Sequence, residues 1–409
     1  MSRLRGHRSA AVATLLAWAV VALSSAACRP PTETERRPER LPLSVAMSPG
    51  EMEGFARADE PRRFVFPDDH GPHPAFRTEW WYVTGNLTAV APSAGSSAGR
   101  DFGYQLTVFR SALEPPGDEP RQEASDWRTD ALYMGHLALT DIEAEEFLAF
   151  ERFSRGAAGL AGAQAKPFRV WIEDWSLLEA AAPDDGIFPL LLVAADGEVG
   201  LELELVPEKP LVLQGDGGLS RKGASPGNAS YYYSFTRLGT TGTVRVGERR
   251  WRVEGTSWLD REWSTSALEP GVVGWDWFAL QLSDGRDLMV YRLRRDDGGT
   301  DPHSAGVLVE PDGDYEVVGA SEFTLRETAR WESPQSGAVY PAGWRLAIPA
   351  AEVDLVVEPR LAAQEHTGSV LYWEGAVTVD GTSAGVEVDG RGYVELTGYG
   401  GPGAASPPS

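Results

Sequence analysis

The stretch VEGTSWLD, residues 253–260, is echoed near the C-terminus as VDGRGYVE, residues 388–395. A valine, a glycine, an aromatic residue and an acid match in the same order, so Trp258 corresponds to Tyr393 and Asp260 to Glu395. Each copy follows a tyrosine-rich segment and a turn rich in glycine. Segments that resemble each other in the same order predict two related units in tandem. We expect these units over residues 61–265 and 266–405.

Short runs of alternating apolar and polar residues fill the chain after about Pro61. Examples are EWWYVTGNL (79–87), FGYQLTVFR (102–110) and WFALQLSDGRDLMVYRLR (277–294). The last of these has Asp-Gly between two alternating runs, which indicates a β-hairpin. Helical periodicity is weak throughout this part of the chain. Many short strands separated by turns predict an all-β protein with a sandwich or barrel architecture.

The N-terminus has the pattern of a bacterial export signal. Three arginines among the first eight residues precede an apolar run over residues 10–23, which is too short to span a bilayer. Small residues then lead into Cys28, where a lipoprotein signal is cut and the cysteine lipidated. The alternative is an ordinary secretory signal cut near Ala27. We therefore expect a signal peptide over 1–27, a Pro-rich flexible tether over 28–60, and a lipid-anchored envelope protein facing the periplasm or the cell surface.

The charge of the chain is strongly acidic. There are 37 basic and 60 acidic residues, a formal net charge of −23. Removal of residues 1–27 takes away three arginines and no acid, which changes the net charge to −26. This balance argues against nucleic acid as a partner and against electrostatic binding to anionic lipid. The chain has one cysteine, so no intrachain disulfide can form.

Six blocks of sequence resemble the AttH and CrtC family, which includes hydroxyneurosporene synthase (carotenoid 1,2-hydratase), and the AttH-like branch is the closer one. The match covers residues 66–399, and the blocks occur in the expected order: EWWYVTGNL, ASYYYSFTRL, SWLDREW, GWDWFALQLSDGRDLMVYRLR, YWEGAVTVDG and GYVELTGYG. The resemblance implies two tandem lipocalin-like (calycin) β-barrels side by side. It also implies a connection with export-type ABC transporter components. The related hydratases add water to an isoprenoid double bond, a reaction that needs an acid, aromatic rings to stabilise a carbocation, and a held water.

The motif SWLDREW, residues 257–263, contains the first candidate catalytic residues. In a strand, Trp258, Asp260 and Glu262 share one face, which places the two carboxylates roughly 6–7 Å apart. If this face borders a dry cavity, burial and mutual repulsion raise at least one carboxyl pKa, and the pair can act as general acid and base. The alternative is a structural salt bridge with Arg261 or Arg252.

Two further residues are candidates for catalysis. Asp276 alternates with tryptophans in WDW (275–277), and it is either a second pocket acid or an ion-pair partner of Arg292 or Arg294. His136 lies in an apolar strand, where a histidine with satisfied hydrogen bonds in the core is the commoner role.

The loop FPDDHGPHPAFRTEW (66–80) holds two histidines and several acids that could bind a divalent ion, but structural hydrogen bonding is favoured and we expect no metal. No G-x-S-x-G elbow and no phosphate loop occur, so neither a serine-hydrolase triad nor a nucleotide site is expected, and no cofactor is indicated.

The expected function is to bind an apolar isoprenoid or lipid-like ligand in an aromatic-lined barrel cavity, as a carrier that could work with an export system. An acid/base enzyme of the carotenoid-hydratase type, which uses Asp260 and Glu262 for hydration, isomerisation or cyclisation, is the alternative. A purely structural envelope protein is a third interpretation. The expected pocket residues are Trp258, Trp81, Tyr232, Trp277, Tyr372 and Glu374.

Overall fold

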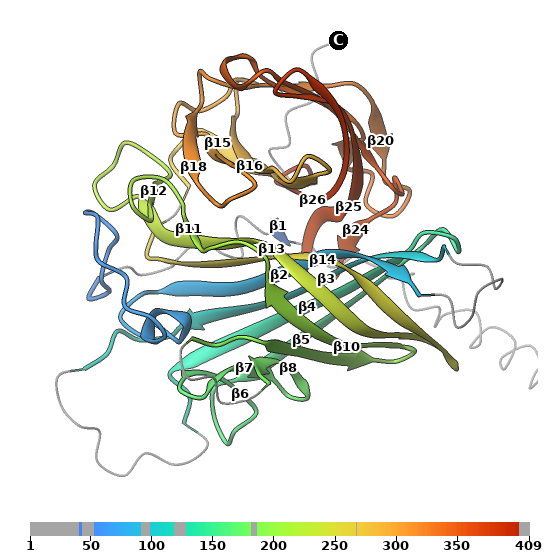
Figure 1. Cartoon of the computed structure of the whole chain (residues 1–409). Coiled ribbons are helices and arrows are strands. Elements are labelled where there is room, and N and C mark those ends of the chain that lie inside the picture. The colour runs from blue at the N-terminus through green and yellow to red at the C-terminus, as the bar shows by residue number, and fades with distance from the viewer. Residues whose placement is uncertain are drawn as a thin grey trace, which may run out of the picture. The chain divides into compact units, whose positions relative to one another are not determined.

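A computed structural model describes residues 41–42, 53–90, 99–117, 128–180, 186–266 and 268–400 (Figure 1). The expected signal peptide, Cys28 and most of the expected tether lie outside these residues. Among the described residues there is no α-helix, only two 3-10 turns, η1 (Asp68–His70) and η2 (Pro349–Ala351). Neither of these turns is long and apolar enough to cross a membrane. The all-β prediction is confirmed.

The first half of the chain forms one antiparallel sheet with the strand order β5-β4-β3-β2-β14-β13-β10-β9-β8-β7-β6. The sheet curls until β7 comes back against β3, β4 and β5, which nearly closes a barrel. The short strands β11 and β12 pair with β13 at its edge. The strands are β2 (Thr78–Ala89), β3 (Asp101–Ala112), β4 (Ala131–Asp141), β5 (Glu146–Arg155), β6 (Ala161–Ala165), β7 (Phe168–Ile172), β8 (Trp175–Glu179), β9 (Leu190–Asp196), β10 (Val199–Pro207), β11 (Val212–Leu213), β12 (Leu219–Arg221), β13 (Ala229–Val246) and β14 (Arg249–Ser264).

The second half forms another sheet with the order β18-β17-β16-β15-β26-β25-β23-β22-β19. Two short strands, β1 and β24, also pair with β25, and β20 and β21 form a separate hairpin. The two sheets are the two lipocalin-like units that the sequence predicted. The strands are β1 (Leu41–Pro42), β15 (Val272–Leu282), β16 (Asp287–Arg295), β17 (Ala305–Val309), β18 (Tyr315–Gly319), β19 (Thr324–Glu327), β20 (Arg330–Glu332), β21 (Val339–Pro341), β22 (Trp344–Ile348), β23 (Val353–Pro359), β24 (Glu365–Thr367), β25 (Val370–Ser383) and β26 (Val386–Thr397).

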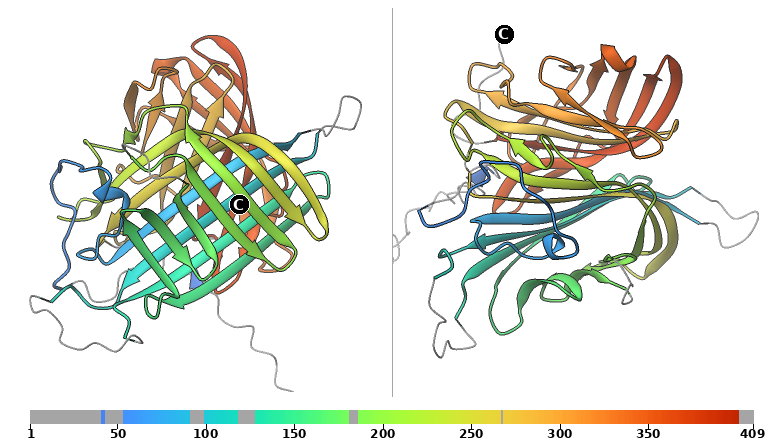
Figure 2. Two further views of the ribbon diagram at one scale, coloured as in Figure 1. Left: turned by 60° about the horizontal axis from the view of Figure 1, so that its bottom comes forward. Right: turned by 60° about the vertical axis from the view of Figure 1, so that its left-hand side comes forward.

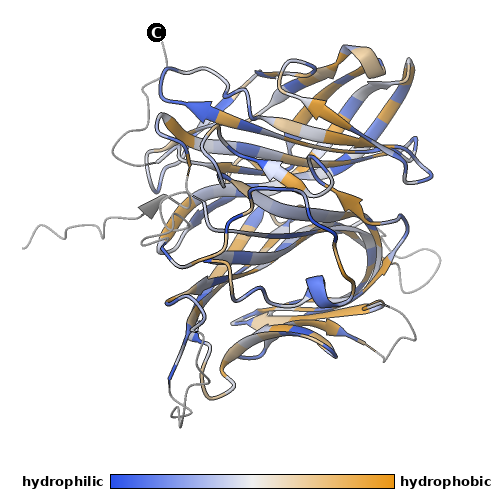
Figure 3. Ribbon diagram, turned by 90° about the vertical axis from the view of Figure 1, so that its left-hand side faces the viewer, coloured by the Kyte–Doolittle hydropathy of each residue, from blue (hydrophilic) through white to orange (hydrophobic). Residues whose placement is uncertain are grey.

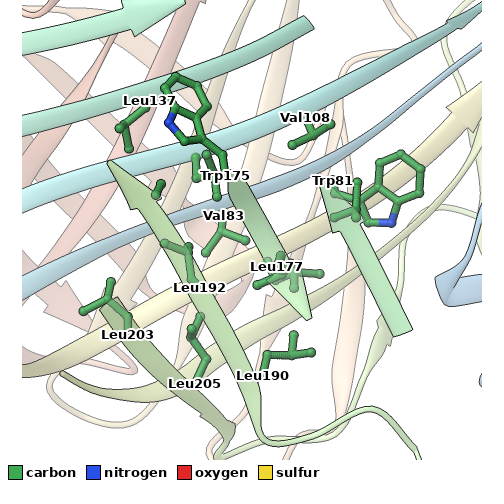
Figure 4. Packing of buried hydrophobic residues seen from close by; sticks show 14 of the residues in the cluster. Trp81, Val83, Val108, Leu137, Trp175, Leu177, Leu190, Leu192, Leu203 and Leu205 are labelled. Carbon is green, nitrogen blue, oxygen red and sulfur yellow. The ribbon is translucent and has the colours of Figure 1, made fainter. Parts of the chain in front are cut away.

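Each barrel interior is filled by apolar side chains from alternate strand positions, which show as alternating colours along the ribbons in Figure 3. In the first barrel, leucines of β9 and β10 pack against Trp175 and against the aromatic and branched residues of β2 and β3 (Figure 4). Trp81 belongs to this core, where the Arg261 guanidinium lies 3.9 Å from its ring centroid. Trp81 therefore does not face the ligand cavity described below, contrary to the expectation from sequence.

The internal repeat appears as two equivalent three-stranded units, β13-β14-β2 and β25-β26-β15. Gly242 and Gly381 hold the same place in the first strand of each unit, with φ of 158° and 157°. A Cβ on either residue would lie 2.1 Å from a carbonyl oxygen of the neighbouring strand. Only glycine fits such an approach, which explains the glycine punctuation that precedes both copies of the sequence repeat.

The two barrels pack against each other through these equivalent units (Figure 2). A cluster that includes Tyr82, Tyr232 and Trp258 of the first barrel meets Trp277 and Tyr393 of the second. The two barrels approach closely at Gly103, where a Cβ would lie 2.5 Å from the Cβ of Ala376, so a side chain on Gly103 would separate the barrels. The interface is thus a buried layer with the composition of a core.

Candidate active site

A cavity of about 140 Å³ lies within this layer between the barrels. Its walls come from the outer faces of β2, β13 and β14 on one side and of β15, β16 and β26 on the other. The cavity lies between the barrels rather than inside one of them. Its lining consists of Thr78, Trp80, Tyr82, Phe109, Lys222, Ser230, Tyr232, Asp260, Glu262, Ser264, Ser266, Leu268, Trp275, Trp277, Tyr291, Leu293 and Glu395.

Strand alternation in SWLDREW places its carboxylates on the cavity side. Asp260 and Glu262 line the cavity, and Leu259 and Trp263 on the opposite face pack inside the first barrel. Arg261 also points away from the cavity and forms an ion pair with the buried Glu79. Arg261 therefore does not form the salt bridge with Asp260 or Glu262 that was the structural alternative.

Asp260 is a buried carboxyl that is held by neutral donors. Its Oδ2 accepts a hydrogen bond from the Tyr232 hydroxyl at 2.5 Å. Its Oδ1 accepts one from the Ser234 hydroxyl at 2.5 Å and one from the Trp258 indole N–H at 2.7 Å. Burial raises the pKa of Asp260 to about 7, although the three donors oppose that rise. The group can therefore change its protonation state near neutral pH.

Glu395 on β26 is the second carboxyl of this kind, and the sequence analysis did not name it as a site residue. The Trp275 indole N–H donates a hydrogen bond of 2.5 Å to its Oε1. Burial raises the pKa of Glu395 to about 7, and the nearby negative charges of Asp260 and Glu262 add to the effect. Its alignment with Asp260 in the sequence repeat was the signal that could have identified it.

Glu262 has a cationic partner, unlike the other two acids. The ammonium group of Lys222 lies 3.5 Å from its Oε1 and 4.0 Å from the centroid of the Tyr291 ring. Burial opposes the charge on Lys222, but Glu262 and Tyr291 together outweigh burial and raise the pKa of the lysine. Of the two acids expected to act together, Glu262 is thus neutralised across the cavity and Asp260 is not.

The other expected pocket residues lie at and behind the cavity wall. Trp277 lines the cavity and donates a hydrogen bond of 3.2 Å from its indole N–H to the Tyr232 hydroxyl. Tyr372 and Glu374 of β25 are buried in the barrel interface but do not line the cavity. His136 of β4 also lies outside the cavity, and its Nδ1 is 2.7 Å from the Tyr372 hydroxyl.

Asp276 is an ion-pair residue. Its carboxylate accepts hydrogen bonds of 2.5 and 2.9 Å from Arg292, one of 2.9 Å from Arg294 and one of 2.8 Å from the Tyr399 hydroxyl. It does not line the cavity. The sequence allowed Asp276 to be a pocket acid or an ion-pair partner, and in the structure it is the ion-pair partner of Arg292 and Arg294 on the adjacent strand.

Two acidic side chains of the histidine-containing segment at the start of β2 form ion pairs with arginines. Asp69 accepts a hydrogen bond of 2.8 Å from Arg62, and Glu79 pairs with Arg110 at 2.9 Å and with Arg261. Burial opposes ionisation of Glu79, but Arg261, His73 and Arg110 together outweigh it and hold the carboxyl pKa well below its usual range. Across the described residues there is no group of three or more histidine, cysteine or acidic side chains arranged to hold a metal ion.

Comparison with known proteins places this site in a family. The AttH-like family model matches residues 57–399. The chain belongs to the AttH-like family. The crystal structure of an AttH protein from Nitrosomonas europaea is 32% identical to it, with a TM-score of 0.71, over 84% of this chain and 100% of the other. The resemblance stated from the sequence is thereby confirmed.

Two relatives are kievitone hydratases. The protein from Fusarium solani subsp. phaseoli is 28% identical over 144 residues, which are 34% of this chain and 40% of that relative. The crystal structure of kievitone hydratase from Nectria haematococca has a TM-score of 0.61 at 14% identity and covers 86% of this chain and 98% of the other. At that identity the structural likeness shows the shared fold, and the sequence match links part of this chain to a hydratase.

Proposed function

We propose that this AttH-like protein is an acid/base enzyme of the hydratase type, which adds water to, or removes it from, an apolar group bound between the two barrels. The observation that carries the proposal is the pair Asp260 and Glu395. Both carboxyls border one aromatic cavity, Asp260 buried and Glu395 partly exposed to it. They come from equivalent strands of the two barrels and have pKa values of about 7 with no cationic partner among the described residues. Carboxyls poised near neutrality are suited to general acid/base catalysis.

The hydrogen bonds assign different roles to the two acids. Three neutral donors stabilise the ionised form of Asp260, whereas Glu395 accepts one indole hydrogen bond. The larger number of donors favours the ionised form at Asp260 more than at Glu395, so we assign the proton to Glu395. Glu395 is the general acid in this proposal, and Asp260 is the base that holds and deprotonates water.

Hydration then proceeds in two steps. Glu395 gives its proton to one carbon of a C=C bond, whose π electrons form the new C–H bond and leave a carbocation on the other carbon. The rings of Trp275 and Trp277 line the cavity and are available to stabilise that charge. Water bonds to the cationic carbon through its oxygen as Asp260 removes one of its protons. Dehydration is the same sequence in reverse.

The size and lining of the cavity define the substrate class. A dry apolar cavity of about 150 Å³ accommodates benzene, so the 140 Å³ found here suits a group of five or six carbon atoms. An isoprenyl unit has this size and gives a tertiary carbocation when it is protonated. The volume is smaller than the roughly 300 Å³ of sites that enclose a drug-sized ligand, so the cavity would receive one end of a larger molecule.

A carrier, which was the first expectation, is the second candidate. The aromatic lining suits apolar ligands generally, but a carrier gains nothing from two largely buried acids that lack cationic partners, because such groups cost stability. The lipid anchor at Cys28, the envelope location and a connection with export components remain proposals from sequence alone.

The test uses the purified full chain incubated in ¹⁸O-labelled water with two probes, kievitone and the five-carbon alkene 2-methyl-2-butene. Mass spectrometry measures alcohols that have gained labelled oxygen. We expect product with the wild type, and at least about 100-fold less with either Asp260→Asn or Glu395→Gln, which is the usual contribution of a general acid or base. Glu204→Gln, an exposed residue of β10, is the matched control and should retain full activity.

A different result supports the carrier. Organic extracts of the same proteins are analysed before any probe is added. If wild type and both cavity variants carry the same unaltered lipid and none hydrates either probe, binding is the function and the carboxyls are structural. If Glu395→Gln forms as much product as the wild type, the assigned acid is wrong.

A further inference from the structure

A line of hydrogen-bonding side chains leads away from the cavity. The Tyr82 hydroxyl at the cavity wall donates a short hydrogen bond to Oε1 of Glu374. Tyr372 lies two residues from Glu374 on the same face of β25, and Oε2 of Glu374 has no hydrogen bond to any described residue. The Tyr372 hydroxyl lies 2.7 Å from Nδ1 of His136, and Nε2 of His136 lies 3.2 Å from Oε1 of Glu151.

The line crosses the barrel interface and ends at solvent. Tyr82, His136 and Glu151 come from β2, β4 and β5 of the first barrel, and Tyr372 and Glu374 come from β25 of the second. The first four side chains outward from the cavity are buried, whereas Glu151 is 20% exposed. Glu151 also accepts hydrogen bonds from the backbone N–H and the hydroxyl of the exposed Ser369.

The donors along this line all point in one direction. Glu151 is a carboxylate and can only accept, so Nε2 of His136 donates to it. In a neutral imidazole Nδ1 then accepts, and its donor is the Tyr372 hydroxyl. The Tyr372 oxygen can still accept a proton, and the nearest donor on its strand face would be Glu374 protonated at the free Oε2, since its other oxygen already accepts from Tyr82.

The charge states fit this direction. Burial raises the pKa of Glu374 well above its usual value, and the nearby Glu395 raises it further, so Glu374 is a neutral acid that both donates and accepts. At the outer end, burial opposes ionisation of Glu151, but its hydrogen bonds to His136 and to residue 369 outweigh it and lower the carboxyl pKa to about 2. The buried His366 is stacked 4.4 Å from Tyr372, and burial holds its pKa well below the usual range, so it adds no positive charge.

We propose that Tyr82, Glu374, Tyr372, His136 and Glu151 form a proton relay between the cavity and the protein surface. Each inner member can both donate and accept a proton, and the free Oε2 of Glu374 is the atom that would pass the proton to Tyr372, so a proton that enters at one end displaces another at the far end. A purely structural contact would not need this, since phenylalanine and leucine would fill the same interface without burying a carboxyl.

The position of Tyr82 connects the relay to the proposed reaction, and its role there rests on that proposed function. Tyr82 pairs in register with Asp260 on the adjacent strand, so both side chains stand on the cavity face about 5 Å apart at their Cβ atoms. During hydration Asp260 takes one proton from water and Glu395 gives one to carbon. The relay carries the proton of Asp260 out to solvent, and Glu395 regains one from solvent through the cavity, so no net proton is consumed.

The relay is tested without substrate, through hydrogen–deuterium exchange of the Glu374 carboxyl. Infrared spectroscopy follows the C=O band of a protonated carboxyl after transfer of the full chain into D₂O. At about pH 9 Asp260 and Glu395 are ionised, since their pKa values are about 7, and their bands are absent. The band that remains is assigned to Glu374 by its loss in Glu374→Gln.

Tyr372→Phe removes the hydroxyl with little change of shape. It should slow the exchange of this band roughly tenfold or more, because exchange then requires local opening of the interface. His136→Phe should have the same effect. His366→Phe is the matched control, since this ring packs on Tyr372 but has no hydrogen bond at Nε2, and its exchange should match the wild type.

Equal exchange rates in wild type, Tyr372→Phe and His136→Phe would overturn the relay. Slowing in His366→Phe as well would also overturn it, because altered packing would then be the cause. Because this measurement needs no turnover, slowed exchange in a protein that hydrates nothing would support the relay and refute the proposed function, and the reverse combination would refute the relay alone.

Discussion

Replacement of Glu395 by glutamine should stabilise the folded protein at alkaline pH and not at acidic pH. Glutamine keeps the oxygen that accepts the Trp275 hydrogen bond and removes the ionisable group. The folded state raises the pKa of Glu395 from 4.5 to about 7. Below pH about 4 the acid is protonated in both states and contributes no difference. Between pH about 4.5 and 7 the unfolded state ionises while the folded state still holds the proton, so the wild type progressively loses stability relative to the variant, and above pH 7 the loss is complete.

The magnitude follows from the same two values. A rise from 4.5 to about 7 corresponds to about 3 kcal/mol between the protonation states. Glu395 is partly exposed to the cavity, and screening there reduces the expected gain to about 2 kcal/mol.

Urea denaturation followed by tryptophan fluorescence measures the free energy of unfolding of both proteins at about pH 4 and pH 9. A difference between variant and wild type that is the same at both pH values, or a variant that is less stable at pH 9, would show that Glu395 does not hold an unfavourable charge. Effects of pH on the rest of the chain cancel in this difference.

Three further predictions concern residues around the site. Asp276→Ala leaves two partly buried arginines without their carboxylate and should lower the free energy of unfolding by about 3–5 kcal/mol in urea. Gly103→Leu wedges the barrels apart at Ala376 and should lower the unfolding temperature while the far-ultraviolet circular dichroism stays native. Lys222→Met leaves Glu262 unpaired and should cost about 2 kcal/mol, and the double variant with Glu262→Gln should regain most of it.

Each of these three has its own contrary result. An Asp276→Ala protein as stable as the wild type would mean that the ion-pair cluster contributes nothing. Full tolerance of leucine at position 103 would place the barrels farther apart than the structure has them. No recovery in the double variant would mean that Lys222 acts through its aromatic neighbours rather than through Glu262.

The fold was largely predictable because strand periodicity and repetition are local signals. The alternation within SWLDREW correctly separated Asp260 and Glu262 from Leu259 and Trp263, since side chains in a strand must alternate. The same signal cannot say whether a face turned away from the barrel core meets water or another sheet. The position of the cavity between the two barrels could therefore not be predicted from it.

Contacts between the two barrels could not be predicted from the sequence for the same reason. Tyr82 and Glu374 are 292 positions apart, and their hydrogen bond depends on how two barrels dock. Trp81 and Tyr82 are neighbours in the chain, yet one fills a barrel core and the other lines the cavity. Only Glu395 could have been identified, because the sequence repeat aligns it with Asp260.

The central claim is that carboxyls between the barrels protonate an alkene, and deuterium transfer from solvent tests it most directly. The full chain is incubated with 2-methyl-2-butene in D₂O, and mass spectrometry measures carbon-bound deuterium in the recovered alkene and in any alcohol. Protonation by Glu395 predicts deuterium on carbon with the wild type and with Glu204→Gln, and none above the protein-free rate with Glu395→Gln. Equal labelling by wild type and Glu395→Gln, or labelling by neither while the alkene stays bound, would contradict the account.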